Sequence, residues 1–185
     1  MSETLAPGID QATAAALGWP KSKYAWVERE RRWLCRSVPL DRVTSTETYR
    51  DLYVEGTQLR LREALPAGGG APMLRLGRKA DVSPDVRLLT SIYLSAEEYR
   101  LLSSLPGNTL RKTRHSLGKV DGADVFVDVF DGPLTGLIMA EAEFGSMEEM
   151  ERYPMPDFAI REVTRDVRYT GGRLARDGLP ADYAA

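Results

Sequence analysis

The chain has 185 residues, 43% of them hydrophobic and 28% charged, which is typical of one folded domain with an apolar core. A net charge of −2, a pI near 5.6 and no exposed basic run argue against a nucleic-acid partner, and no export signal or apolar run near the ~20 residues of a membrane span is present, so we expect a cytoplasmic protein without membrane contact. A single cysteine, Cys35, and a single histidine, His115, exclude an internal disulfide and a Cys/His zinc site, so that any metal must be a hard cation held by carboxylates.

Both ends of the chain are rich in small and turn-forming residues. We expect residues 1–22 to form a flexible N-terminal arm with a short helix at 12–17, and residues 176–185 to form a C-terminal tail. The domain between them would span residues 23–175. Alternation of period two predicts strands in this domain. The expected strands are residues 24–36, 57–63, 73–79, 87–94, 110–117, 123–130 and 137–144.

Two helices interrupt the strands. Ser95 with Glu98, and Ser146 with Glu149, have the spacing of capping boxes, which predicts helices at residues 96–105 and directly after Ser146. Seven or eight strands at hairpin-like spacing then predict a mainly β (α+β) fold: an antiparallel sheet or barrel with a few flanking helices.

Charged residues recur two or four apart within the predicted strands, so that they share a face. The same-face sets are Glu28, Glu30 and Arg32; Arg60 and Arg62; Arg75 and Lys79; Lys112 and Arg114; and Glu141 and Glu143. Each strand taken alone fits an ordinary amphipathic strand with a solvated polar face. Same-sign neighbours repel, however, so the sets together also fit the inner wall of a barrel that binds a polyanion and a divalent metal.

The distribution of charge along the chain agrees with such a wall. Up to Lys119 there are 19 Lys and Arg against 13 Asp and Glu, and beyond it 6 against 14. Opposite charges on separate segments of one domain indicate either pairing between the segments or a cationic wall and an acidic wall that face a shared ligand.

In their order along the chain, these sets resemble the CYTH domain, also called the triphosphate tunnel metalloenzymes. The matching motifs are Glu28-x-Glu30-x-Arg32, Asp51-Leu52-Tyr53-Val54, Leu59-Arg60-Leu61-Arg62, Leu76-Gly77-Arg78-Lys79, Lys112-Thr113-Arg114, Asp128-Val129-Phe130-Asp131-Gly132 and Glu141-Ala142-Glu143-Phe144. Each motif is weak alone, but their shared order over roughly residues 24–175 is specific. The resemblance implies an antiparallel eight-stranded β-barrel that forms a tunnel, with helices outside.

Three positions depart from the family. Arg32 stands where the family has lysine, and the strand at residues 87–93 lacks the inward glutamates that relatives often carry. Gly171 and Gly172 stand where relatives often have a polar residue. The reduced number of acids predicts a weaker metal site or a change in which triphosphate fits.

The resemblance implies metal-dependent hydrolysis of a triphosphate, either inorganic tripolyphosphate or a small organic triphosphate. The residues that would bind phosphate are Arg32, Arg60, Arg62, Lys79, Lys112 and Arg114. The residues that would hold Mg²⁺ or Mn²⁺ are Glu28, Glu30, Asp128, Glu141 and Glu143. Lys112 is the candidate catalytic residue, as the group that polarises the attacking water.

Two alternatives remain open: a class IV adenylate cyclase acting on ATP, and a non-catalytic polyphosphate or nucleotide binder. The partner in each case is a small triphosphate-bearing molecule, and a homodimer is an assembly that relatives often form. Cys35 and Trp33 are expected in the core, and His115 on the face opposite Lys112. Trp26 is expected to pack, with stacking on a base at the tunnel mouth as its alternative.

Overall fold

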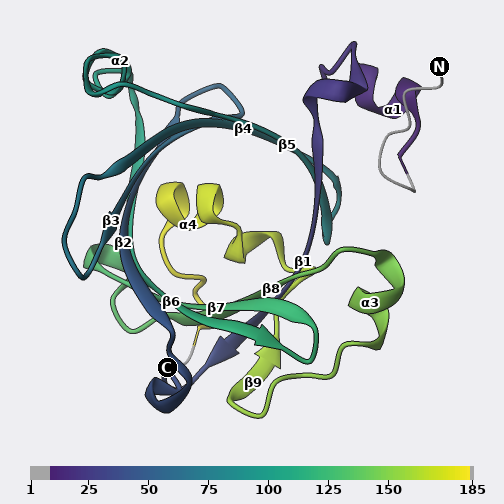
Figure 1. The fold of residues 1–185 in the computed structure, drawn as a ribbon, viewed down its shortest axis with the longest axis vertical. Helices are drawn as coiled ribbons and strands as arrows, with labels where there is room; N and C mark the ends of the chain where they lie inside the picture. Colours follow the sequence, from purple (N-terminus) through teal and green to yellow (C-terminus); the bar gives the residue numbers. More distant parts are fainter. Residues whose placement is uncertain (1–8, 184–185) are drawn as a thin grey trace.

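The computed structural model describes residues 9–183, and its main feature is a closed antiparallel β-barrel. Strands follow the order β5-β4-β3-β2-β6-β7-β8-β1, and the ring closes because β1 also pairs with β5 (Figure 1). This confirms the predicted fold class. The barrel strands are β1 (Trp26–Cys35), β2 (Ser45–Val54), β3 (Leu59–Pro66), β4 (Met73–Ser83), β5 (Val86–Tyr93), β6 (Gly107–Val120), β7 (Ala123–Phe130) and β8 (Ile138–Glu143).

A ninth strand and four helices accompany the barrel. They are β9 (Ala159–Glu162), α1 (Gln11–Ala16), α2 (Ala96–Leu102), α3 (Met147–Arg152) and α4 (Gly171–Asp177). Both predicted capping boxes are present, at Ser95 for α2 and at Ser146 for α3. Alternation did not predict β2, which only the motif around Tyr53 indicated, and neither β9 nor α4 was predicted. Among residues 9–183, no helix is long and apolar enough to cross a membrane.

One edge of β1 is shared between two strands. Its first residues, from Trp26 to Arg29, pair with β5, and its last, from Trp33 to Cys35, pair with β9. Residues 30–32 lie between these two partners, and we call this place the seam. There the Glu30 amide donates to the Asp85 carbonyl at 3.0 Å. At the seam, the pairing of β1 changes from β5 to β9.

Much of the apolar core lies outside the barrel. Trp33 is fully buried on the outer face of β1, where it packs with outward residues of β7 and β8 and with Met150 of α3. On another side, Ala14 of α1 and Trp19 cover Leu88 of β5. Because the inward faces carry charge, these outer clusters supply a large part of the hydrophobic stabilisation.

Parts of both chain ends pack against the barrel. Of residues 1–22, expected as a flexible arm, the structure describes 9–22, and Ala14 and Trp19 in this stretch are buried. The expected tail begins inside α4, which runs to Asp177. Cys35 and Trp33 are buried as predicted, whereas the packing role expected for Trp26 is wrong, since its exposed fraction is 77%.

The C-terminal helix α4 lies within the ring of strands (Figure 1). Its residue Leu174 is buried among apolar residues that share the inward faces of their strands with the charged residues further along, including Leu110 of β6 and Met139 of β8. The lumen of the barrel is therefore apolar where α4 fills it and charged beyond. Tyr169, in the segment that precedes α4, is also fully buried in this cluster.

Of the two glycines that begin α4, Gly171 allows the helix to approach the barrel wall. A Cβ on Gly171 would lie 2.1 Å from the Tyr53 hydroxyl oxygen, whereas a Cβ on Gly172 would lie 3.4 Å from the nearest ring carbon of Tyr53, an ordinary contact. This close approach gives a structural reason for the departure at Gly171.

We expect Gly171→Ala to destabilise the protein by about 1–3 kcal/mol, because the added methyl group collides with the partly buried side chain of Tyr53. Gly172→Ala is the matched control, since the same change meets no collision and gains helix propensity of up to ~1 kcal/mol. Urea denaturation of the two variants beside the wild type measures both effects. Equal stability of the two variants would contradict this account of α4 packing.

Candidate active site

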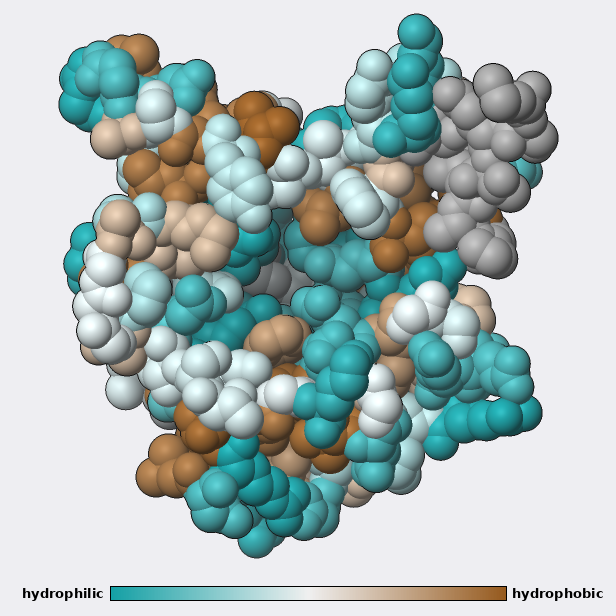
Figure 2. Space-filling model, in the orientation of Figure 1, coloured by the Kyte–Doolittle hydropathy of each residue, from teal (hydrophilic) through white to brown (hydrophobic). Residues whose placement is uncertain are grey.

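The barrel encloses a charged cavity of about 950 Å³. Its volume lies within the range of small-molecule sites. Ten of the eleven predicted site residues line it, and the eleventh, Asp128, is fully buried behind them. The lining carries ten Lys and Arg against six Asp and Glu, an excess of four positive charges when all are ionised, and this excess favours an anionic ligand. Figure 2 shows the hollow, with hydrophilic residues around it.

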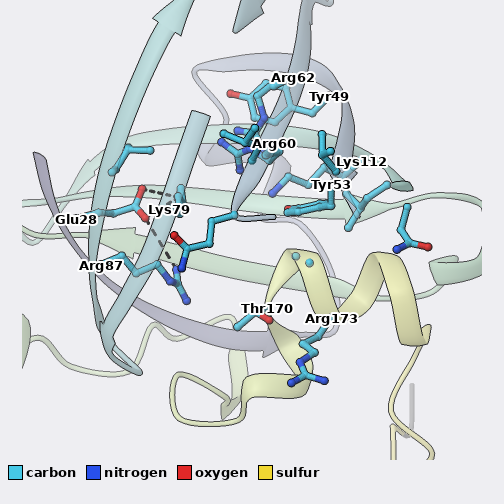
Figure 3. Close-up of a pocket in the computed structure, with 18 of the residues that line it drawn as sticks. Glu28, Tyr49, Tyr53, Arg60, Arg62, Lys79, Arg87, Lys112, Thr170 and Arg173 are labelled. Carbon is cyan, nitrogen blue, oxygen red and sulfur yellow. Dashed lines mark hydrogen bonds and ion pairs between the residues drawn. The ribbon is translucent and has the colours of Figure 1, made fainter. Parts of the chain in front are cut away.

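Arg62 belongs to the cationic side of the cavity and is held by a buried carboxylate. Asp51 of β2 lies directly opposite Arg62 of β3 and accepts hydrogen bonds from Nε at 2.7 Å and Nη2 at 2.6 Å. The guanidinium also lies 4.2 Å from the centre of the Tyr49 ring (Figure 3). Burial raises the pKa of the Asp51 carboxyl, but the charges of Arg62 and Arg60 outweigh it and hold this pKa well below its ordinary value.

Asp128 plays the same part for the two basic residues of β6. Its carboxylate accepts from Lys112 Nζ at 2.5 Å and from Arg114 Nε and Nη2, both at 2.7 Å. Arg114 also contacts the Glu141 carboxylate of β8. Burial and the charge of Arg114 lower the pKa of the Lys112 ammonium, in opposition to Asp128. Asp128 therefore orients both cations from behind the cavity wall.

The acidic side of the cavity combines paired and unpaired carboxylates. Lys79 Nζ lies 2.6 and 2.8 Å from the two Glu28 oxygens (Figure 3). By contrast, no Lys or Arg among residues 9–183 lies within 4.0 Å of the Glu143 carboxylate. Burial and the neighbouring charges of Glu28 and Glu141 raise the pKa of Glu143 to about 7. Glu143 is thus a carboxylate whose negative charge lacks a close counter-ion.

These carboxylates fit a hard cation in part. Among the described residues, no three Asp, Glu, His or Cys side chains form a ready-made metal site. Mg²⁺, however, is usually bound through one or two carboxylates together with substrate phosphates. The unpaired Glu143, with Glu141 on the same face of β8, supplies such a partial donor set. Glu28, Glu30 and Asp128, the other predicted ligands, are engaged by basic side chains, and Glu141 itself contacts Arg114, so a cation there would share Glu141 with that guanidinium.

Arg32 lies at the seam and uses its guanidinium on backbone carbonyls. Nη1 donates to Tyr169 at 3.1 Å, and Nη2 donates to Thr164 at 2.9 Å and to Pro84 at 3.4 Å. Two of these carbonyls belong to the segment that leads into α4. The planar guanidinium of Arg32 presents separate N–H donors to all three carbonyls, whereas a lysine has one ammonium nitrogen that cannot reach them all. Arg32 therefore joins the cavity wall to the segment that carries α4.

Several lining residues were not predicted as site residues. Arg87 of β5 points into the cavity from a strand for which the sequence indicates only the absence of inward glutamates (Figure 3). Arg87, Leu89 and Ser91 all line the cavity. Because these residues are two apart on one strand, alternation in the sequence could have predicted that the Arg87 side chain points inward. Arg173 and Arg176 also line the cavity, but they lie on α4, which no pattern predicted.

The fold and the cavity define this chain as a β-barrel protein with a charged lumen. It is 29% identical over 153 residues to the inorganic triphosphatase of Nitrosomonas europaea, a match that covers 80% of this chain and 96% of that protein. A crystal structure of an inorganic triphosphatase has a TM-score of 0.55 and 25% identity, over 80% of this chain and 93% of that one.

A second solved structure, of a protein from Pyrococcus horikoshii, shares the fold. Its TM-score is 0.50 and its identity 19%, over 67% of this chain and 82% of that one. No family model matches the chain. The similarity therefore rests on the relatives and on the barrel itself.

We expect Arg32→Lys to destabilise the protein by about 1–3 kcal/mol, because it leaves buried carbonyls at the seam without donors. The loss should occur even though the substitution restores the residue type of the resembled motif. Arg36→Lys, at an exposed position just beyond β1, is the control and should leave stability unchanged. Urea denaturation decides, and an Arg32→Lys protein as stable as the wild type would contradict the role given to the guanidinium.

The buried pair of Asp51 and Arg62 should make stability depend on pH. Since the pKa of Asp51 is lowered by folding, its contribution is complete above the unfolded value of about 3.9 and is lost progressively as the pH falls from there through the lowered pKa of the folded state. Asp51→Asn should therefore cost ~3–5 kcal/mol near neutral pH and about 1 kcal/mol less near pH ~3, where this loss has begun.

The measurement is the free energy of unfolding of the wild type and of Asp51→Asn at these two pH values. Asp124→Asn is the control, because its ion pair with Lys119 is exposed and should contribute ~1 kcal/mol or less at either pH. A cost of Asp51→Asn that stays the same at both pH values would rule out this linkage.

Proposed function

We propose that this chain hydrolyses a triphosphate, either inorganic tripolyphosphate or a small organic triphosphate, inside the barrel with the help of Mg²⁺ or Mn²⁺. The observation that carries the proposal is a cavity inside the barrel with ten basic side chains, in which the inward carboxylate of Glu143 on β8 lacks a close counter-ion. The relative from Nitrosomonas europaea, named an inorganic triphosphatase, supports the same chemistry.

The basic side chains that face the cavity bind the phosphates. Arg62 and Arg114 are pre-oriented by Asp51 and Asp128, so little side-chain entropy is lost when they bind an anion. A guanidinium binds two phosphate oxygens at once, which fixes the orientation of each phosphate as well as its position. The full set in this role is Arg32, Arg60, Arg62, Lys79, Lys112 and Arg114.

A divalent cation would be held by Glu143 and Glu141 together with phosphate oxygens, and when bound it supplies charge neutralisation and an activated water. The predicted contributions of Glu28, Glu30 and Asp128 as ligands compete with the ion pairs that these carboxylates already make. For Asp128 we propose the role of positioning Lys112 and Arg114.

In the reaction the water oxygen bonds to the terminal phosphorus and the bond from that phosphorus to the bridging oxygen breaks. Orthophosphate leaves, the remaining diphosphate keeps the bridging oxygen, and the proton lost by the water passes to solvent. Lys112, buried and directed by Asp128, donates a hydrogen bond to the oxygens whose charge increases. Positioning and charge neutralisation are sufficient for phosphoryl transfer, so no histidine base is needed.

A non-catalytic binder of polyphosphate or nucleotide is the second candidate. The observation that favours it is the engagement of Glu28 and Glu30 by basic side chains, which leaves few carboxylates for metal. A homodimeric assembly and a cytoplasmic location stay predictions.

The test of the proposed function is phosphate release by the purified chain from tripolyphosphate, ATP and thiamine triphosphate, each with Mg²⁺ and with Mn²⁺. We expect release from at least one of them, and a loss of roughly 100-fold or more for Lys112→Met, which removes a donor to the developing charge. Lys119→Met, an exposed lysine of the same strand, is the control and should keep full activity.

Two outcomes would contradict hydrolysis. Tight binding of a triphosphate by calorimetry without phosphate release would favour the binder, and formation of cyclic AMP from ATP would favour the cyclase. Circular dichroism of Lys112→Met, with Lys112→Arg as a variant that keeps the charge, separates loss of chemistry from loss of fold.

A further inference from the structure

Arg87 lies inside the barrel on β5, between two strands that carry acidic residues. Its Cα pairs with Glu28 of β1 on one side and with Asp81 of β4 on the other. Only 8% of Arg87 is exposed. Figure 3 shows its side chain on the same side of the cavity as Lys79, with Glu28 between them.

Arg87 makes ion pairs with all three acidic residues around it. Its Nη1 contacts the Glu30 carboxylate and lies 3.9 Å from the nearer Glu28 oxygen, and its Nε donates to Asp81 at 2.8 Å. One guanidinium therefore links β1 with β4 across β5.

Two more basic side chains complete this cluster. Lys79 Nζ donates hydrogen bonds to both carboxylate oxygens of Glu28, and Arg32 Nε lies 3.4 Å from a carboxylate oxygen of Glu30. The cluster then holds three carboxylates and three cations, and its charges balance. The members of this cluster, which we call the β1 ion cluster, are Glu28, Glu30, Asp81, Arg32, Lys79 and Arg87.

A divalent cation at the β1 ion cluster would have to compete for oxygens that already face ammonium and guanidinium groups. Displacing Arg87 from Glu30 would leave a buried arginine without its main counter-ion, which is strongly unfavourable. Directly across the β1–β8 pairing from Glu30 lies Glu143, which has no such cation. The two glutamates therefore differ in their availability to metal.

We propose that Arg87 is a built-in counter-ion that closes the Glu28 and Glu30 pair to metal, so that the cavity takes one divalent cation, on the Glu143 side, and not two. The positive charge of Arg87 then neutralises Glu28 and Glu30 in place of a second metal ion, and this charge is covalently part of the chain. The inference deepens the proposed triphosphatase function and rests on it for the identity of the anion, but the metal count can be measured without turnover.

The test counts Mn²⁺ bound to the full chain by electron paramagnetic resonance of the free ion during a titration, with a non-hydrolysable triphosphate analogue present to supply the phosphate oxygens and its own Mn²⁺ binding measured separately and subtracted. The wild type should bind one Mn²⁺, and Arg87→Gln should gain a second, because Glu28 and Glu30 lose a guanidinium. Arg87→Lys keeps the charge and should stay at one. Arg75→Gln removes another arginine of the same cavity, outside the β1 ion cluster, and should also stay at one.

A second pair of variants decides the matter if Arg87→Gln fails to fold. Glu143→Gln should abolish Mn²⁺ binding, whereas Glu30→Gln should leave one ion bound. Two ions bound to the wild type, no gain in a folded Arg87→Gln, or loss of the ion in Glu30→Gln would each overturn the proposal. Absence of phosphate release with the expected Mn²⁺ counts would instead refute the proposed hydrolysis and leave the role of Arg87 standing.

Discussion

Charge pairing across neighbouring strands is the condition on which the whole barrel depends. A closed barrel that faces basic and acidic side chains inward must pair the most deeply buried of them, since an unpaired buried charge is far more costly than a paired one. Asp51 with Arg62, and Asp128 with Lys112 and Arg114, meet this condition through adjacent strands. The apolar clusters outside the barrel then supply stabilisation that the charged part of the lumen cannot.

The same pairing gives the charged residues two different roles: some carboxylates orient basic side chains, and those basic side chains face the cavity. Asp51 and Asp128 are almost completely buried and serve the cations in front of them. Arg62, Lys112 and Arg114 keep a face toward the cavity, because their carboxylates approach from behind. A rigid cationic wall results, whose geometry is set before any ligand arrives, which is the arrangement that electrostatic catalysis and selective anion binding both require.

Alternation in the sequence predicted an antiparallel sheet or barrel and placed charged residues on shared faces, and the resemblance to the CYTH domain implied the closed barrel and the site roles. Ten of the eleven residues so chosen line the cavity, because the direction of a strand side chain follows from parity alone. Depth and pairing do not follow from parity. Asp128 shares the inward parity, yet it lies behind Lys112, since its distance from the cavity depends on register and on longer neighbours. The pairing of Asp51 with Arg62 also depends on register between β2 and β3, and α4 is too short to give a periodic signal.

The filled end of the lumen gives the cavity a direction. Since α4 and the apolar residues around Leu174 occupy that end, a ligand would enter the charged part of the lumen from the opposite end. A linear polyanion would then insert tip first, and any bulky group on it would have to trail toward the solvent. Residues at the opening of the cavity, which contact the bulky group, would then discriminate between substrates, whereas the residues deep in the cavity would bind the phosphates of all of them.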